Sequence, residues 1–207
     1  MAPVRRERAD LVAQRKNSTQ KRLRGGLSLD SLLVSRRDLL IDAALDVIAE
    51  YGVAGTTHRR VASAAAVPLG STTYYFADLH DLLGAAFGRF ADQISERFES
   101  RLTRARTVEE VITEITDFVL YDFDDPRELA LSYEFYAYAI RRPMIGDMVE
   151  AWFARSQQAL ARFYDPDTAR LVDTFIEGLF TYRGLARKFA DGAEIRRGLA
   201  LLSGIPA

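Results

Sequence analysis

From residue 35 onward, apolar residues recur every three or four positions, a spacing that places them on one face of a helix. The first of these stretches follows Ser35 and Asp38, whose S-x-x-D spacing predicts an N-terminal capping box, and it closes at Gly52. Its apolar face would consist of Leu40, Ala44, Val47, Ile48 and Tyr51. No sustained alternation of apolar and polar residues between turn dipeptides predicts a strand, so the pattern indicates an all-α chain.

Threonine, aspartate and proline residues mark where the later helices begin. Two short helices are predicted over about residues 57–65 and 68–75, followed by a long helix over about residues 78–102. The remaining predicted helices cover about residues 107–123, 125–142, 143–164, 165–188 and 191–203. The chain would then hold roughly nine helices, preceded by an arm over residues 1–34 that is mostly flexible, with a short helix around residues 29–34 as one interpretation.

The two short helices have the composition of a helix–turn–helix. Small residues crowd their crossing at Ala62, Ala65 and Ala66, which lets the helices approach closely. Polar and aromatic residues follow on the second helix, where a major-groove reader presents its hydrogen-bonding groups. Arg59 and Arg60 on the first helix could neutralise phosphates. An alanine-rich structural hairpin would have a similar composition, so composition alone leaves both interpretations open.

Residues 36–85 also carry a series of short motifs: Glu50-Tyr51-Gly52, Thr56-Thr57, Val61-Ala62, Val67-Pro68-Leu69-Gly70-Ser71, Tyr74-Tyr75-Phe76 and Leu82-Leu83. In this order they resemble the DNA-binding domain of the tetracycline-repressor (TetR) family of bacterial regulators. The rest of the chain matches that family only in length and helical layout. The resemblance implies a three-helix DNA-binding domain over residues 35–82 and an effector-binding and dimerisation domain over residues 83–207.

The resemblance implies roles for single residues of the motif. Thr57 would cap its helix and touch a phosphate, Gly70 would allow close approach to DNA, and Phe76 would anchor the recognition helix in the core. Together with the neighbouring cations and His58, which could equally be a half-buried packing residue, the residues expected at DNA are Thr57, His58, Arg59, Arg60, Leu69, Gly70, Ser71, Thr72, Thr73, Tyr74 and Tyr75.

The sequence departs from the family pattern at three positions. Leu79 stands where a phosphate-contacting lysine is common, Thr73 replaces a common tyrosine, and Ala66 replaces a common glycine in the turn. The missing lysine puts one phosphate contact in doubt. His80 and the basic arm are alternative sources of that contact.

Charge and composition narrow the class of protein. The 207 residues have a net charge of −1, but residues 1–37 carry +7 and the remainder −8, which indicates a polyanionic partner at one end or else a solubilising or cloning-derived tail. The chain has no cysteine and two histidines, so we expect no disulfide, no metal site and no cofactor. No apolar run approaches the ~20 residues of a membrane helix, and a cytoplasmic protein is expected.

Aromatic residues are concentrated between positions 118 and 153. Most would be core, but aromatic rings with polar tips also line small-molecule sites, and in the TetR family the corresponding helices enclose an effector pocket. The residues expected to line it are Phe118, Tyr121, Tyr133, Tyr136, Tyr138, Trp152 and Phe153. Glu134, Tyr138 and Arg141 share a helical face, and a solvated, salt-bridged face is the preferred interpretation of that pattern.

The last two predicted helices carry wide apolar faces that suit a two-fold, four-helix dimer interface. The residues expected there are Leu171, Phe175, Leu179, Ile195, Leu199 and Leu202, with Gly178 and Gly184 allowing close approach across the axis. A monomer whose own core uses these faces is the alternative.

The sequence therefore predicts a dimeric, ligand-responsive transcriptional regulator. We expect a repressor that binds a palindromic DNA operator and is released by a small, largely apolar effector. No G-x-S-x-G, H-E-x-x-H, P-loop or dinucleotide motif supports an all-α enzyme. An interaction module with a degenerate helix–turn–helix stays open because Leu79 replaces the expected lysine.

Overall fold

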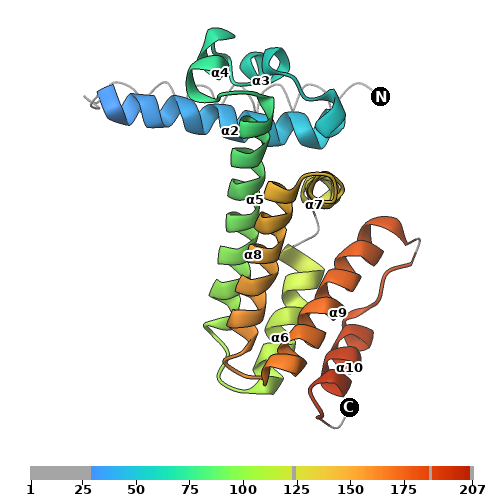
Figure 1. Cartoon of the computed structure of the whole chain (residues 1–207). Coiled ribbons are helices and arrows are strands. Elements are labelled where there is room, and N and C mark those ends of the chain that lie inside the picture. Colours follow the sequence, from blue (N-terminus) through green and yellow to red (C-terminus); the bar gives the residue numbers. More distant parts are fainter. Residues whose placement is uncertain (1–28, 123–124, 187, 206–207) are drawn as a thin grey trace, which may run out of the picture. The chain divides into compact units, whose positions relative to one another are not determined.

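The computed structural model describes residues 29–122, 125–186 and 188–205, and over these residues it contains nine α-helices, one π-helical segment and no strand (Figure 1). The all-α prediction is confirmed. The chain divides into two units, residues 1–39 and residues 40–207. In the first unit the described residues form the start of helix α2 (Leu29–Gly55). The proposed flexible arm lies almost entirely outside the described residues.

The predicted start of the first helix at Ser35 is wrong. Helix α2 is already helical at Leu29 and runs through Ser35 without a break. No glycine or proline lies between Leu29 and Asp38, so nothing stops the helix from extending N-terminally past the potential cap. Its other end is as expected, because Gly52 adopts φ 69° and ψ 171° and kinks the chain out of the helix.

The predicted DNA-binding part of the second unit consists of residues 40–55 of α2, α3 (His58–Ala64), α4 (Gly70–Tyr75) and the first turn of the next helix, over residues 79–82. The expected apolar face of α2 is buried except for Tyr51, which is 48% exposed. Val61 of α3 and Phe76, which follows α4, are also buried, so all three helices share one core. The predicted role of Phe76 as a buried anchor is therefore confirmed.

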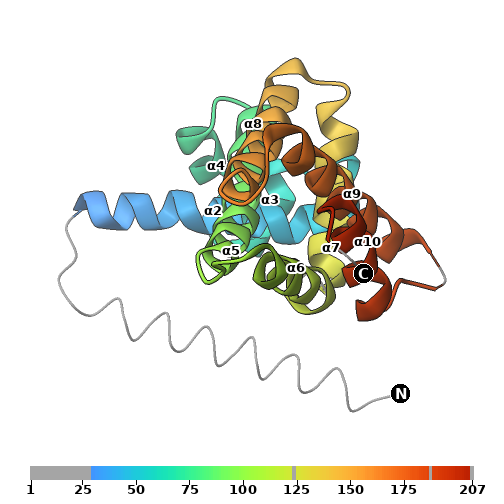
Figure 2. The same ribbon diagram turned by 90° about the horizontal axis from the view of Figure 1, so that it is seen from below.

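Six further helices and the π-helical segment form the helical domain. Helices α5 (Leu79–Leu102) and α8 (Pro143–Leu160) run side by side (Figure 1), and α7 (Pro126–Ala139) packs against α8. Seen from below in Figure 2, α6 (Val108–Asp117), α9 (Pro166–Leu185) and α10 (Gly192–Leu202) gather on one side of that pair. None of the helices in the described part of the chain is both long and apolar enough to cross a membrane.

Side-chain caps start five of these six helices where the sequence predicted them, and α8 begins at Pro143 without one. Thr107, Asp125 and Asp165 each accept backbone N–H groups of the first turn, and Asp191 with Glu194 forms a complete capping box. The helix ends are less regular. The helix predicted to reach residue 123 ends at Asp117 and passes directly into a π-helical segment, η1 (Phe118–Asp122).

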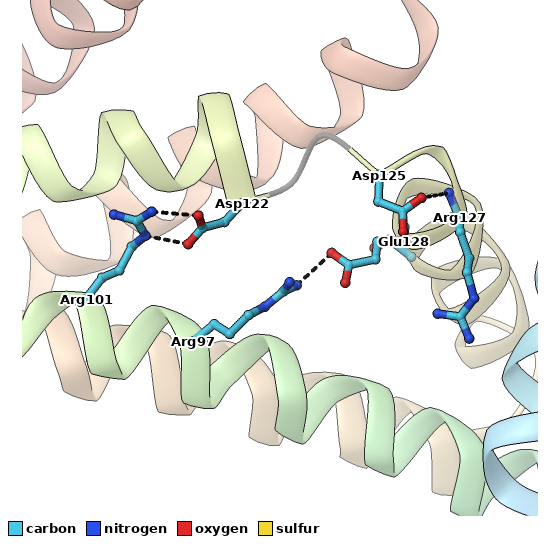
Figure 3. Close-up of polar contacts among 7 residues, drawn as sticks. Arg97, Arg101, Asp122, Asp125, Arg127 and Glu128 are labelled. Carbon is cyan, nitrogen blue, oxygen red and sulfur yellow. Dashed lines mark hydrogen bonds and ion pairs between the residues drawn. The ribbon is translucent and has the colours of Figure 1, made fainter. Parts of the chain in front are cut away.

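Arginines of α5 hold the segments on either side of residues 123–124 (Figure 3). Arg101 makes a two-pronged contact with Asp122 at the end of η1 and a third bond to Glu114, at 3.1 Å. Arg97 pairs with Glu128 of α7 at 2.6 Å. These guanidinium–carboxylate pairs fix the start of α7 relative to α5. The Arg101 guanidinium also lowers the pKa of Asp122.

Candidate nucleic-acid interface and buried cavity

A tight turn over residues 65–69 joins α3 to α4 and sets the position of the recognition helix. Ala66 lies in this turn with φ 54°, the left-handed region that glycine adopts most easily. The Val67 N–H donates to the Ala62 carbonyl at 3.0 Å and closes the turn. An alanine at the position where the family commonly has glycine therefore keeps the glycine-like backbone, at a conformational cost.

One face of α4 and the residue before it are open to solvent. Leu69 is 49% exposed, Tyr74 is 73% exposed, and Thr73 is exposed between them. A Cβ built on Gly70 would meet no described atom within 4 Å, so the backbone at this point is free to approach another molecule. Tyr75 is half-buried and packs edge-on against Tyr74, with ring centroids 4.8 Å apart.

The expectation that Thr72 faces DNA is wrong. Thr72 is fully buried and its Oγ1 donates to the Leu69 carbonyl at 2.7 Å. Residues four apart lie on the same face of a helix, and Thr72 shares its face with the buried anchor Phe76 rather than with Tyr74. The sequence marked the whole helix as polar and did not separate these two faces.

The side chains at the start of α3 differ in their exposure and in the contacts that they make within the protein. Thr57 caps the helix by accepting the Arg60 N–H at 3.2 Å, and its side chain and that of Arg59 are exposed. The Arg60 guanidinium instead donates to the Gly55 carbonyl and lies 4.6 Å above the Tyr51 ring. His58 is half-buried, and its enclosed Nδ1 has no partner among the described residues.

His80 is also engaged within the protein. Its Nδ1 lies 2.5 Å from the Tyr138 hydroxyl, and its Nε2 lies 3.3 Å from an Arg142 guanidinium nitrogen. Since arginine only donates, Nε2 accepts, and Nδ1 carries the proton that is donated to Tyr138. Leu79, at the position of the missing lysine, is half-buried against the core and supplies no donor.

Helix α7 contacts the DNA-binding part at three points. Arg127 pairs with Asp46 of α2 at 2.7 Å, the Glu134 carboxylate accepts the Val53 N–H at 2.8 Å, and Tyr138 meets His80. The interpretation of Glu134 and Tyr138 as part of a solvated face is therefore wrong. Their shared helical face was the available signal, but their partners lie 81 and 58 residues away and the sequence did not identify them.

A small cavity of about 20 Å³ lies in the helical domain, with walls from α5, η1, α8 and α9. This is close to the space that one water molecule needs. Two of the seven expected pocket residues, Phe118 and Trp152, line it directly. Tyr136 donates its hydroxyl to Glu177, which lines the cavity, and Phe153 stacks beside Tyr136 and Trp152.

The other three expected pocket residues lie elsewhere. Tyr121 is 70% exposed, and Tyr138 faces His80. Tyr133 donates to the carbonyl oxygens of Phe180 and Thr181 at the far end of α9. The cavity borders one face of η1, through Phe118, and no residue of α7 lines it directly.

Two carboxyl groups on α9, which were not predicted from the sequence, reach the cavity. Asp173 is 4% exposed and accepts hydrogen bonds from Ser156 Oγ and, at 2.9 Å, from Gln157 Nε2. Burial raises the pKa of Asp173, while the bonds from Ser156 and Gln157 oppose that rise. Burial raises the pKa of Glu177 to about 7; the Tyr136 bond opposes this and the nearby Asp173 adds to it. Their position within the apolar face of α9 was the available signal.

A larger, open groove of about 630 Å³ lies beside the ion pairs of Figure 3. Arg97 and Arg101 of α5 and Arg104 after it line this groove, and Asp122 and Glu128 face Arg101 and Arg97. Arg97 and Arg101 are paired with these carboxylates, and the ion pairs hold η1 and α7 in place.

The predicted dimer residues divide into exposed and buried sets. Ile195 and Leu199 are fully buried and Leu179 is 8% exposed, so these three belong to the subunit's own core. Gly184 admits the Tyr133 hydroxyl of the same subunit, which would lie 2.1 Å from an added Cβ. The exposed apolar residues are Leu171, Tyr182, Leu185 and Leu201, and half-buried Phe175 and Leu202 belong to the same two helices.

An exposed α4, held by a tight turn on α3 and anchored by Phe76, defines the helix–turn–helix class of transcriptional regulators. The family model for bacterial regulatory proteins, tetR family, matches residues 40–86. The HTH-type transcriptional regulator CymR of Pseudomonas putida is 30% identical over 152 residues, which cover 73% of this chain and 68% of CymR. The chain belongs to the TetR family of transcriptional regulators, which are not enzymes.

Solved structures agree with this assignment. SCO7518 of Streptomyces coelicolor A3(2), assigned as a transcriptional regulator, is 39% identical with a TM-score of 0.76, and the match covers 81% of this chain and 98% of SCO7518. The multidrug binding protein EbrR, solved with imidazole, is 33% identical with a TM-score of 0.68 over 83% of this chain and 97% of EbrR. EbrR has also been solved with proflavin, ethidium and malachite green.

Proposed function

We propose that this regulator is a repressor that binds a palindromic operator as a dimer and leaves it when a small, largely apolar effector enters the helical domain. The observation that carries the proposal is the position of α7. One of its residues, Tyr136, bonds to a cavity carboxyl, and two others, Glu134 and Tyr138, bond to the DNA-binding part. A change in the cavity therefore has a short physical route to α2 and α5.

The proposed DNA-binding domain covers residues 35–82, and its contacts come from two sets of residues. Leu69, Ser71, Thr73 and Tyr74 are exposed or half-exposed at the recognition helix and would face base edges, with Gly70 allowing the close approach. Thr57, Arg59 and Tyr75 would hold phosphates. Arg60 and His58 are less suited, since one is bound to Gly55 and the other is half-buried.

The proposed effector-binding and dimerisation domain covers residues 83–207. Exposed apolar side chains on α9 and α10 favour a two-fold interface, because one subunit alone leaves Leu171, Leu185 and Leu201 in water. Such a dimer would present its two recognition helices to half-sites about 34–36 Å apart. An effector that binds better to a different separation would lower DNA affinity by the difference in its binding to the two states.

Relatives support a small-molecule effector. EbrR binds imidazole, proflavin, ethidium and malachite green, and it is 32–34% identical to this chain in those complexes. In this chain the cavity is only about 20 Å³, so a ligand of drug size would have to push its walls apart. Binding of such a ligand would therefore shift the helices around the cavity.

The proposed DNA contacts are tested by retention of a palindromic fragment from the protein's own promoter, measured by fluorescence anisotropy over a range of salt concentrations. Arg59→Ala should weaken binding to every sequence and flatten the slope of log K against log salt by about one unit. Arg106→Ala, an exposed arginine between α5 and α6, is the matched control and should change nothing. If the wild-type protein fails to retain the fragment at low salt, the repressor proposal is wrong.

A further inference from the structure

The cavity in the helical domain has both aromatic and acidic residues in its wall. Phe98, Phe118 and Trp152 contribute rings to its wall, and Asp173 and Glu177 contribute carboxyl groups from successive turns of α9. The Trp152 ring lies nearly parallel to the rings of Phe135 and Tyr136, with ring centroids 5.7 Å away. Carboxyl groups beside flat aromatic faces form a site of negative potential.

One polar group in the wall has no partner among the described residues. Ser95 of α5 is 4% exposed and lines the cavity, and its Oγ forms no hydrogen bond to any described residue. A buried hydroxyl without a partner costs free energy that a polar ligand would recover. This serine therefore indicates, independently of the two carboxyl groups, that the cavity receives a molecule with polar atoms.

We propose that this cavity binds the effector as a flat aromatic cation, whose positive charge is held between Asp173 and Glu177 and whose ring lies against Trp152. The proposal rests on the effector-release function above and assigns the chemical class of its ligand. Ser95 would bond to a polar atom of the same molecule. Entry of the ring would separate α5 from α8 and α9, whose side chains now leave room for about one water.

The electrostatics favour a cation over a neutral or anionic molecule of equal size. Two buried carboxyl groups four residues apart cannot both ionise cheaply without a compensating charge. No basic side chain lines this cavity among the described residues, and Glu99, the third carboxylate in its wall, is already paired with Arg155 at 2.9 Å. An entering cation would supply the missing charge, and an anion would meet repulsion.

The test uses the chain's single tryptophan, Trp152, as a reporter of binding in the absence of DNA. The probes are 5-methylphenanthridinium, a permanent cation, and 6-methylphenanthridine, a neutral molecule of the same size at pH 8. We expect the cation to quench Trp152 fluorescence with an affinity at least tenfold higher than that of the neutral probe. Equal affinities of the two probes for the wild-type protein would overturn the proposal without any variant.

Two isosteric variants locate the charge. Glu177→Gln and Asp173→Asn should each weaken the cation at least tenfold and leave the neutral probe within twofold. Glu150→Gln, which removes an exposed carboxylate of α8 outside the cavity, should bind both probes like the wild type. Unfolding midpoints in urea show that each variant is folded. Cation binding that is unchanged in both cavity variants would contradict the assignment.

Failure of this inference can be distinguished from failure of the repressor proposal. If 6-methylphenanthridine releases the operator fragment and the cation does not, the repressor function stands and the ligand class is wrong. If the cation binds through Glu177 while the protein retains no operator, the ligand site stands and the repressor proposal is wrong. Operator release is read by anisotropy of a labelled fragment, with a protein-free sample of the fragment and probe to correct for intercalation.

Discussion

The Glu134 carboxylate on α7 accepts the backbone N–H of Val53, 81 residues earlier in the chain, at 2.8 Å. Val53 directly follows Gly52, where α2 kinks, and a Cβ on Gly52 would lie 2.8 Å from the other carboxylate oxygen of Glu134. The Glu134 carboxylate therefore packs against the kink at Gly52 and connects the end of α2 to α7. Tyr136 of the same helix α7 donates a hydrogen bond to the cavity carboxyl group of Glu177.

Glu134→Ala should weaken the link between effector and DNA more than it weakens DNA binding itself. Loss of the carboxylate leaves the half-buried Val53 N–H without its acceptor, which costs about 1–3 kcal/mol of stability. We expect a higher effector concentration for half-release of the operator, measured by anisotropy. Glu134→Gln retains an acceptor oxygen and should restore most of the response. An Ala variant that responds like the wild type would show that this bond does not transmit the signal.

Ala66→Gly should stabilise the protein. A non-glycine residue in the left-handed region costs about 1–2 kcal/mol, and glycine returns about 0.5–1 kcal/mol of that as added freedom in the unfolded chain. The net gain should be about 0.5 kcal/mol in urea unfolding. Ala137→Gly, at an exposed position inside α7, is the matched control and should lose about 1 kcal/mol. Equal losses in both variants would mean that Ala66 is unstrained.

The sequence predicted the elements far better than it predicted which faces of them meet. Helix starts could be predicted because a cap is a local interaction between residues two or three positions apart, as at Asp78 and Asp191. The buried faces of the helices could not be predicted in this way, because burial depends on partners that are distant in the chain. Thr72 is polar yet buried, and Ile195 is apolar but serves its own subunit rather than a partner.

The acidic residues in the wall of the cavity were not predicted from the sequence. Asp173 lies in an otherwise apolar helical face, but a single acid in such a face is also compatible with an exposed helix edge. Only the packing of α9 against α8 places it beside Ser156 and Gln157, which satisfy its oxygens. The DNA-binding residues were easier to predict because the motif over residues 50–76 is contiguous.

Ionisation of Glu177 should lower the stability of the protein as the pH rises from 4.5 to 7. Its folded pKa of about 7 lies above the ordinary 4.5, so the native state favours the protonated form. The stabilising effect is complete below pH 4.5 and is lost as the pH rises through about 7. Glu177→Gln should therefore match the wild type near pH 4.5 and exceed it by about 2–3 kcal/mol at pH 8 in urea unfolding. A constant difference across this range would contradict the raised pKa.

The same group should make cation binding depend on pH. A cation beside Glu177 favours the ionised carboxylate, so binding below pH 7 must release a proton. A permanent cation should therefore bind about tenfold more weakly at pH 6 than at pH 8. The other titratable groups facing Glu177 are Asp173, Tyr136 and Glu99, the last paired with Arg155. If the Glu177→Gln variant loses the pH dependence of cation binding and the Glu150→Gln variant keeps it, Glu177 is the titrating group. If the Glu177→Gln variant keeps the pH dependence, another group causes it.

Leu185→Asp should convert a dimer into folded monomers. Leu185 is 73% exposed at the end of α9, so a carboxylate there costs the single subunit little but would be buried without a partner in the proposed interface. Operator affinity should fall with dimerisation, because two linked half-site contacts become independent ones. Ile140→Asp places the same charge at an 87% exposed position after α7 and should remain dimeric. Sedimentation at micromolar concentration separates the two variants. A wild-type protein that sediments at about its chain mass of 23.3 kDa yet binds the operator tightly would show that DNA binding needs no interface on α9 and α10.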